Sequence, residues 1–145
     1  MTENINWTIP TLHSALAELD LVKSNEITVT QTESEYPALK LVMNEFGGQP
    51  IYLAISGDQI LVDALLVEAR QVKNPAEFND AVLRSRDLFP LSSIGIKTLS
   101  NGGVVYDMFG ALAAVSSLAV VVHEVVTLAT NVNSAVQAFE NHFDI

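Results

Sequence analysis

Residues 36–69 read YPALKLVMNEFGGQPIYLAISGDQILVDALLVEA, and this stretch decides the fold. Apolar residues recur at every second position on both sides of Gly47-Gly48 and of Gly57, which is the period of a β-strand. Glycines supply the positive φ angles that tight hairpin turns require. We therefore predict three consecutive antiparallel strands, over residues 36–45, 51–55 and 59–69.

The last of these strands, 59–69, is apolar on both faces. One face carries Leu61, Leu65 and Val67, and the other carries Ile60, Val62, Ala64 and Leu66. A strand with this pattern is typically central in a sheet or covered on both sides. We predict one of these two positions for it.

The N-terminal flank adds one helix and one strand. Leu12, Leu16 and Leu19 recur at helical spacing, and Thr8 is a suitable N-cap, so we predict a helix over 8–22. Alternating apolar residues then indicate a strand over 26–32.

The strongest local signal in the chain is Asn74-Pro75-Ala76-Glu77. Asn74 is a favourable N-cap, proline is tolerated at the first helical position, and Glu77 completes a capping box. The sequence therefore predicts a helix over 75–88, which Pro90 ends.

Two more strands and a long helix complete the chain. The strands span 94–99 and 104–112, joined by a turn at Gly102-Gly103. The final helix begins at Ser116 or Ser117, either of which can cap it. Its apolar stripe comprises Leu118, Val121, Val122, Val125, Leu128, Ala129, Val132, Val136 and Phe139. Its polar flank comprises Thr127, Asn131, Ser134 and Gln137.

The predicted element order is therefore α-β-β-β-β-α-β-β-α. Strands joined by short turns form an antiparallel sheet, and helices packed on it give a two-layer α+β fold. A chain of 145 residues without a linker or repeat fits one domain, spanning 1–145.

Composition excludes several classes of function. The chain has no cysteine, so it forms neither disulfides nor thiolate metal sites. Its 17 acidic and 7 basic residues give a formal net charge of −10, which repels phosphate backbones and anionic membrane surfaces. We expect no nucleic-acid binding, and either simple solubility or a basic partner.

The sequence also predicts a soluble cytoplasmic protein. No positively charged segment precedes an apolar run at the N-terminus, as it would in a signal peptide. The most apolar stretch, 110–122, is shorter than the roughly 18–20 residues that a membrane-spanning helix needs. We therefore expect no membrane span.

The stretch FNDAVLR at 78–84, continued by LFPLSSIGI at 88–96, resembles the YjfI-like family of uncharacterised bacterial proteins. The family has no established activity, so the resemblance implies no catalytic residue. Genes of the family lie beside those for membrane-stress proteins similar to phage shock protein A, which implies a stress-linked partner. The element order is also similar to that of secretion chaperones and YbjN-like domains, which implies a dimer that binds protein chains.

Candidate catalytic and metal-binding residues are few. His13, His123 and His142 lie on separate stretches without metal-ligand spacing. We interpret His123-Glu124 as part of a solvated helix face, and we expect disorder at His142 and Asp144. Glu33 and Glu35 could begin a hard-cation site, although an ordinary acidic loop explains them better. We predict no catalytic residue, metal or cofactor.

The hypothesis that fits best is a non-enzymatic protein-binding or adaptor module, chaperone-like in character. Spare apolar surface and the lack of a convergent polar cluster favour it. The alternative is a small-molecule-binding or enzymatic domain with a pocket between sheet and helices.

The final helix is also a candidate surface for self-association. Ala119, Val120 and Val126 add apolar surface beyond its inward stripe. A helix that is apolar nearly all round is buried on both sides, and two-fold dimers are the commonest assembly. We therefore predict a homodimer through these residues, with cover by the strand at 104–112 or by the first helix as the competing explanation.

Overall fold

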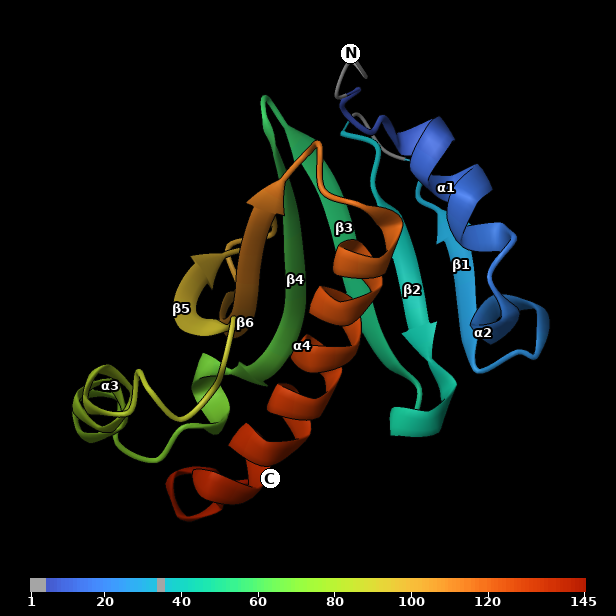
Figure 1. Ribbon diagram of the computed structural model, residues 1–145. Coiled ribbons are helices and arrows are strands. Elements are labelled where there is room, and N and C mark those ends of the chain that lie inside the picture. The colour runs from blue at the N-terminus through green and yellow to red at the C-terminus, as the bar shows by residue number, and fades with distance from the viewer. Residues whose placement is uncertain (1–4, 34–35) are drawn as a thin grey trace.

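The computed structural model describes residues 5–33 and 36–145 of the chain (Figure 1). The helices are α1 (Ile9–Ala17), α2 (Asp20–Lys23), α3 (Pro75–Arg84) and α4 (Leu118–Ala138). The strands are β1 (Ile27–Gln31), β2 (Leu39–Met43), β3 (Gln49–Ser56), β4 (Gln59–Glu68), β5 (Ser93–Thr98) and β6 (Val104–Ala113). Short 3-10 helices η1 (Asn44–Phe46), η2 (Ala69–Gln71) and η3 (Glu140–His142) connect or end these elements.

The strands form one antiparallel sheet in the order β1-β2-β3-β4-β6-β5. The first four strands are a meander, as the turn glycines predicted. Gly47 and Gly48 in the β2–β3 connection and Gly102 in the β5–β6 turn have positive φ. β5 and β6 form a second hairpin, and β6 rather than β5 pairs with β4. The predicted α+β class and element order are confirmed, and β1 and β5 are the two edges of the sheet.

α1, α2 and α4 pack on a single face of this sheet, so the fold has two layers. α4 packs across β3, β4 and β6, while α1 and α2 contact β1 (Figure 1). α3 lies near the opposite edge of the sheet, at the end where the chain terminates (Figure 1). The core between the layers is wholly apolar at its centre, including Leu12, Leu39, Leu41, Ile51, Leu53, Ile60, Val62, Met108, Val121, Val125 and Leu128.

Burial on α4 differs from the prediction at two polar residues, Glu124 and Asn131. The apolar stripe faces the sheet as predicted, and Ser117 caps the helix. Asn131, predicted on the polar flank, is only 6% exposed, and its Nδ2 donates to Pro90 O (2.7 Å) and to Ser92 Oγ (2.9 Å). Buried amides need such partners, and these bonds fix the loop that leads into β5.

The predicted first helix, 8–22, is two helices. α1 begins at its Thr8 cap as predicted, but Leu19 is extended (φ −70°, ψ 144°) and separates α1 from α2. The second predicted helix also ends early, at Arg84 instead of residue 88, because Ser85 Oγ bonds back to Ala81 O (2.7 Å). Serine offers the backbone this alternative to the helical ladder.

Of the two hydrogen bonds that make up the capping box predicted for α3, the described residues form one. Asn74 Oδ1 accepts a hydrogen bond from Glu77 N (3.2 Å), so the predicted cap is present. The structure shows no return bond from the Glu77 side chain to the backbone of Asn74.

A register shift between Leu65 and Val67 changes the faces of β4. The prediction placed Val67 with Leu61 and Leu65, but the irregularity turns Val67 into the core, where it is buried. β4 is central, as predicted, yet the residues that the structure describes cover it on one side only. Leu61 and Leu65 stay on the outer face, where both are exposed.

The predicted disorder at the C-terminus is wrong. Phe143 is buried and forms an antiparallel bridge with Val72, and Asp144 N donates to Gln71 O (2.7 Å). Phe78 of α3 makes edge-to-face contacts with Tyr106, Phe139 and Phe143, at centroid distances of 4.8, 5.4 and 5.3 Å. This aromatic cluster ties α3 and the C-terminal segment to the end of α4.

Candidate functional site: the uncovered face of the sheet

The uncovered face is the side of the sheet opposite α1 and α4. Its central row, defined by strand register, runs Lys40, Tyr52, Asp63, Phe109 and Ser93 across β2, β3, β4, β6 and β5. The next row toward the end of β4 contains Leu65, Asp107 and Gly95. Antiparallel sheets commonly leave one face to solvent, and such a face is normally polar.

This face departs from that pattern because it is largely apolar at its centre. Its half-exposed apolar side chains are Tyr52, Leu61, Leu65 and Phe109, and Leu65 is 50% exposed. Soluble monomeric proteins rarely expose large contiguous apolar patches, and such patches often mark binding sites. The face is therefore the first candidate for function.

A charged cluster of Asp63, Lys97 and Asp107 lies among these apolar side chains. Lys97 Nζ of β5 binds Asp63 Oδ2 of β4 at 2.9 Å, across the intervening strand β6. This bond raises the pKa of Lys97. While Asp107 is ionised, the second oxygen of the same carboxylate, Asp63 Oδ1, is buried and accepts no hydrogen bond among the described residues. A buried acceptor without a partner costs free energy, so this oxygen is poised to accept a donor.

Asp107 of β6 is the third member of the cluster. It lies diagonally across from Asp63 on the neighbouring strand, and diagonal pairs on one face of a sheet are within reach of each other. Burial, together with the hydrogen bond that its protonated form donates to Asp63, raises the pKa of Asp107 to about 7. Near neutral pH the two carboxyl groups therefore share a proton part of the time.

Gly95 on β5 allows Phe109 to lie against the edge strand. A Cβ on this glycine would lie 2.9 Å from the Phe109 ring and 3.4 Å from Asp107 Oδ1. The absence of a side chain at this position thus leaves room for both the aromatic ring and the carboxyl group beside it.

Two adjoining concavities meet at the charged cluster. One, of about 360 Å³, is lined by Leu61, Asp63, Gly95, Lys97, Asp107 and Phe109 among others. The other, of about 390 Å³, is lined by Ala38, Tyr52, Ala54, Leu61, Asp63 and Lys97. Leu61, Asp63 and Lys97 belong to both, so the two hollows form one shallow surface with the cluster at its middle.

This surface can make ionic, hydrogen-bonding and apolar contacts. It combines carboxylates, an ammonium group and apolar side chains, and it brings neither a histidine nor a serine into the cluster. No group of three or more His, Asp or Glu side chains within the described ranges is arranged to hold a metal ion. Of the proposed cation site, Glu33 is described and Glu35 lies outside the described residues.

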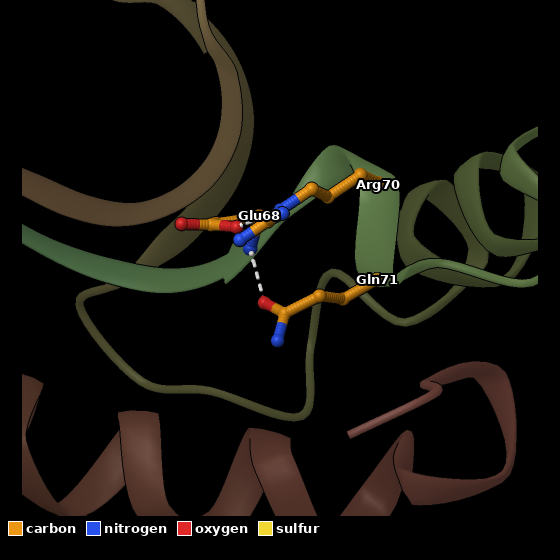
Figure 2. Close-up of polar contacts among 3 residues, drawn as sticks. All are labelled: Glu68, Arg70 and Gln71. Atoms are coloured by element: carbon orange, nitrogen blue, oxygen red, sulfur yellow. Dashed lines mark hydrogen bonds and ion pairs between the residues drawn. The ribbon is translucent and has the colours of Figure 1, made fainter.

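A further hollow lies where β4 ends and the β5–β6 turn returns. It has a volume of about 430 Å³, and Glu68 and Arg70 lie on its rim. Figure 2 shows that Arg70 turns back onto the Glu68 carboxylate, while Gln71 Oε1 accepts from Glu68 N (3.1 Å). These groups satisfy each other and stabilise η2, so their polar chemistry is already used by the fold.

A third region, the groove between α3 and β5, matches the pocket expected between sheet and helices. It has a volume of about 320 Å³ and is lined by Asn79, Val82, Leu83, Ile94, Gly95, Ile96 and Tyr106. Its polar groups are engaged with each other, because Tyr106 Oη and Asn79 Oδ1 are 2.6 Å apart.

The structure corrects the interpretation of His123-Glu124 as a solvated pair. His123 is exposed, but Glu124 is only 6% exposed and its carboxylate lies against the Cα of Gly110 on β6. Burial raises the pKa of Glu124. The two side chains therefore lie in different environments, although the charge of His123 lowers the pKa of Glu124 in opposition to burial.

The predicted self-association residues differ in exposure. Ala119 and Val120 are exposed on α4, whereas Val126 is half-buried and packs against the core of its own chain. α4 also has the length and hydropathy of a membrane-spanning helix, and 44% of that stretch is buried within the protein. Packing against the sheet accounts for the apolar side chains on its buried face, including Val121, Val125 and Leu128.

The sequence predictions missed Asp63, Lys97 and Asp107. A signal was present, since Asp63 interrupts an otherwise apolar strand and Asp107 lies within another predicted strand. Their proximity depends on the pairing of β4 with β6, which follows from the position of β6 between β4 and β5.

The fold and site together define a class: an α+β protein whose antiparallel sheet is covered on one face and carries a charged cluster on an apolar open face. The family model for uncharacterized proteins conserved in bacteria (DUF2170) matches residues 6–143. Uncharacterized protein YjfI of Escherichia coli strain K12 is 33% identical over 113 residues, which are 78% of this chain and 82% of YjfI. YjfI of Escherichia coli O157:H7 gives the same values. The chain belongs to this family, which confirms the resemblance found in its sequence.

Proposed function

We propose that the protein is a non-enzymatic binding module that docks a protein partner on the uncovered face of its sheet. The observation that carries this proposal is the set of half-exposed apolar side chains around a partly desolvated charged cluster. Protein interfaces share this composition, with aromatic and apolar residues at the centre and a few well-placed polar groups.

The binding module could act as an adaptor or as a chaperone-like protein, and its partner could be a protein linked to membrane stress. These are more specific versions of the same proposal. Each requires a surface that holds another polypeptide. A shallow, broad face suits a protein segment better than a small molecule, because small-molecule sites bury most of their ligand in a deep pocket.

Site-specific photocrosslinking in the native bacterial host tests the proposal. A photoreactive phenylalanine analogue replaces Tyr52 on the uncovered face in one variant, and the exposed Leu88 beyond α3 in a control. We expect a discrete protein adduct from position 52 and none from position 88. Equal adducts from both positions, or none from position 52, would contradict a docking role for this face.

The second candidate function is binding of a small apolar molecule in the groove between α3 and β5. The observation that favours it is the apolar lining of Val82, Leu83, Ile94 and Ile96. Native mass spectrometry of freshly purified protein is the test. A bound small molecule that is lost in Ile96→Asp would support this second function over the first.

A further inference from the structure

We propose that the partner presents an arginine or lysine, flanked by apolar side chains, to the Asp63 and Asp107 carboxyl groups at the centre of the uncovered face. This inference rests on the proposed function and specifies the chemistry of the partner. It is carried by the charge balance of the cluster and by its apolar surroundings.

The cluster contains two carboxyl groups and one cation. The ammonium of Lys97 is bound to Asp63 Oδ2 at 2.9 Å, and while Asp107 is ionised Asp63 Oδ1 is buried without a hydrogen bond among the described residues. The charged groups that face Asp107 from the flanking strands are Asp63 on β4 and Lys97 on β5. When both carboxyl groups are ionised, one negative charge is therefore uncompensated in a partly desolvated place.

A donor cation from outside the chain would remove this imbalance. A guanidinium or ammonium group that donates to Asp107 also offsets the negative charge of the neighbouring Asp63 carboxylate, and charge-assisted hydrogen bonds of this kind are strong. A metal ion is a poorer match, because hard cations need several oxygen ligands and the lysine ammonium repels them.

The surroundings match the aliphatic stem and the neighbours of such a side chain. Leu61 and Phe109 line the same hollow as the two carboxyl groups, and Leu65 lies directly opposite Asp107. The stems of arginine and lysine pack along apolar surface while their charged ends reach polar groups. The net charge of −10 also steers basic partners toward the protein.

The inference predicts a particular pH dependence. The cation binds the ionised form of Asp107, so binding displaces the proton that this group carries near neutral pH. Because the pKa of Asp107 is about 7, affinity should rise about tenfold from pH 6 to pH 8 and then level off. Removal of the carboxylate should abolish this rise.

Selection from a random dodecapeptide phage library tests the inference with the full chain. The library is panned at pH 8 on the wild-type protein and, in parallel, on Leu61→Asn/Leu65→Asn, which makes the uncovered face polar. Circular dichroism checks that every variant is folded. Peptides that bind the wild type and not the polar-face variant are synthesised, and their affinities are measured by calorimetry.

The inference predicts that these face-dependent peptides contain arginine or lysine beside apolar residues. Replacement of that residue by norleucine, or Asp107→Asn in the protein, should weaken binding about tenfold or more at pH 8. Asp63→Asn should act in the same direction, whereas Asp87→Asn at an exposed site should have no effect.

Two results would overturn the inference. Only the second would also contradict the proposed function. Face-dependent peptides that lack basic residues, or whose affinity is unchanged by both cluster substitutions, would overturn the partner chemistry and leave the proposed function standing. Absence of any peptide that depends on Leu61 and Leu65 would overturn the docking role of the face together with the inference.

Discussion

At the scale of single residues, Asp107 is expected to make stability depend on pH. Its pKa rises from the ordinary 3.8 to about 7 in the folded protein, so the folded state holds the proton more tightly than the unfolded state. This contribution to stability is complete at low pH and is lost as the pH rises from about 4 through 7. Because the group is partly solvated, we expect a loss of about 1–2 kcal/mol.

The variant Asp107→Asn should lack this loss, because its amide does not titrate. Urea denaturation of wild type and variant between pH 5 and pH 8 measures the difference. The variant should gain stability relative to wild type as the pH rises, while Asp87→Asn should track the wild type. Parallel curves for all three proteins would contradict the account of Asp107.

Other single residues show where sequence reasoning reaches its limit. Glu124 and Asn131 are polar residues on a helix, and position alone placed them in solvent. Asn131 is buried because its amide holds the loop at Pro90 and Ser92, about forty residues away in the chain. Pairwise contacts of this kind are set by tertiary structure, and no local pattern records them.

At the scale of elements, local signals predicted the strands well and the helix ends less well. Turn glycines and alternation are local, so β2, β3 and β4 could be predicted from them. The break at Leu19 has no such signal, since glutamate and leucine at 18–19 are good helix formers. Contacts of α1 and α2 with β1 position the two helices separately. The register shift in β4 could not be predicted either, because the strand is apolar on both faces and its pattern does not change at the shift.

The predicted N-cap of α3 is present in the structure, so its contribution to stability can be tested by substitution. Asn74→Ala removes the bond from Glu77 N to Asn74 Oδ1 and should lower the free energy of unfolding by about 0.5–2 kcal/mol. Ser134→Ala, on the exposed side of α4, is the control. Chemical denaturation compares them, and equal stability of Asn74→Ala and wild type would show that the cap contributes nothing.

The attachment of α3 depends on the aromatic cluster around Phe78. Phe78→Ala should cost about 3–5 kcal/mol, because it empties a fully buried site that contacts Tyr106, Phe139 and Phe143. Leu83→Ala removes an exposed side chain of the same helix and should change stability little. If Phe78→Ala fails to fold, Phe78→Leu should show a smaller, measurable loss. Similar losses for Phe78→Leu and Leu83→Ala would contradict this role.

At the scale of the whole molecule, self-association through α4 remains a proposal, and fewer exposed residues support it than the sequence predicted. Val126 packs against the core, so the exposed part of the predicted surface is Ala119 and Val120, with Val120 49% exposed. If the protein dimerises there, Val120→Glu should shift it to monomer in sedimentation equilibrium at micromolar concentration. A wild-type monomer, or a dimer that Val120→Glu leaves intact, would remove this surface from consideration.

The whole molecule presents its helices on one side of the sheet and its apolar, charged face on the other. Sequence patterns could predict the two layers, because periodicity reports which residues face a core. They could not predict the site, because Asp63, Asp107 and Lys97 come from three strands whose order in the sheet is not the order in the chain.

The central claim is that the uncovered sheet face is the surface that binds a partner. Methyl NMR of the 15.7 kDa protein, titrated with a peptide selected on the wild type, tests it most directly. We predict that the methyl signals of Leu61 and Leu65 shift, while those of Val120 on α4 and Leu83 on α3 stay in place. Shifts at Val120 or Leu83, with Leu61 and Leu65 unchanged, would contradict the claim.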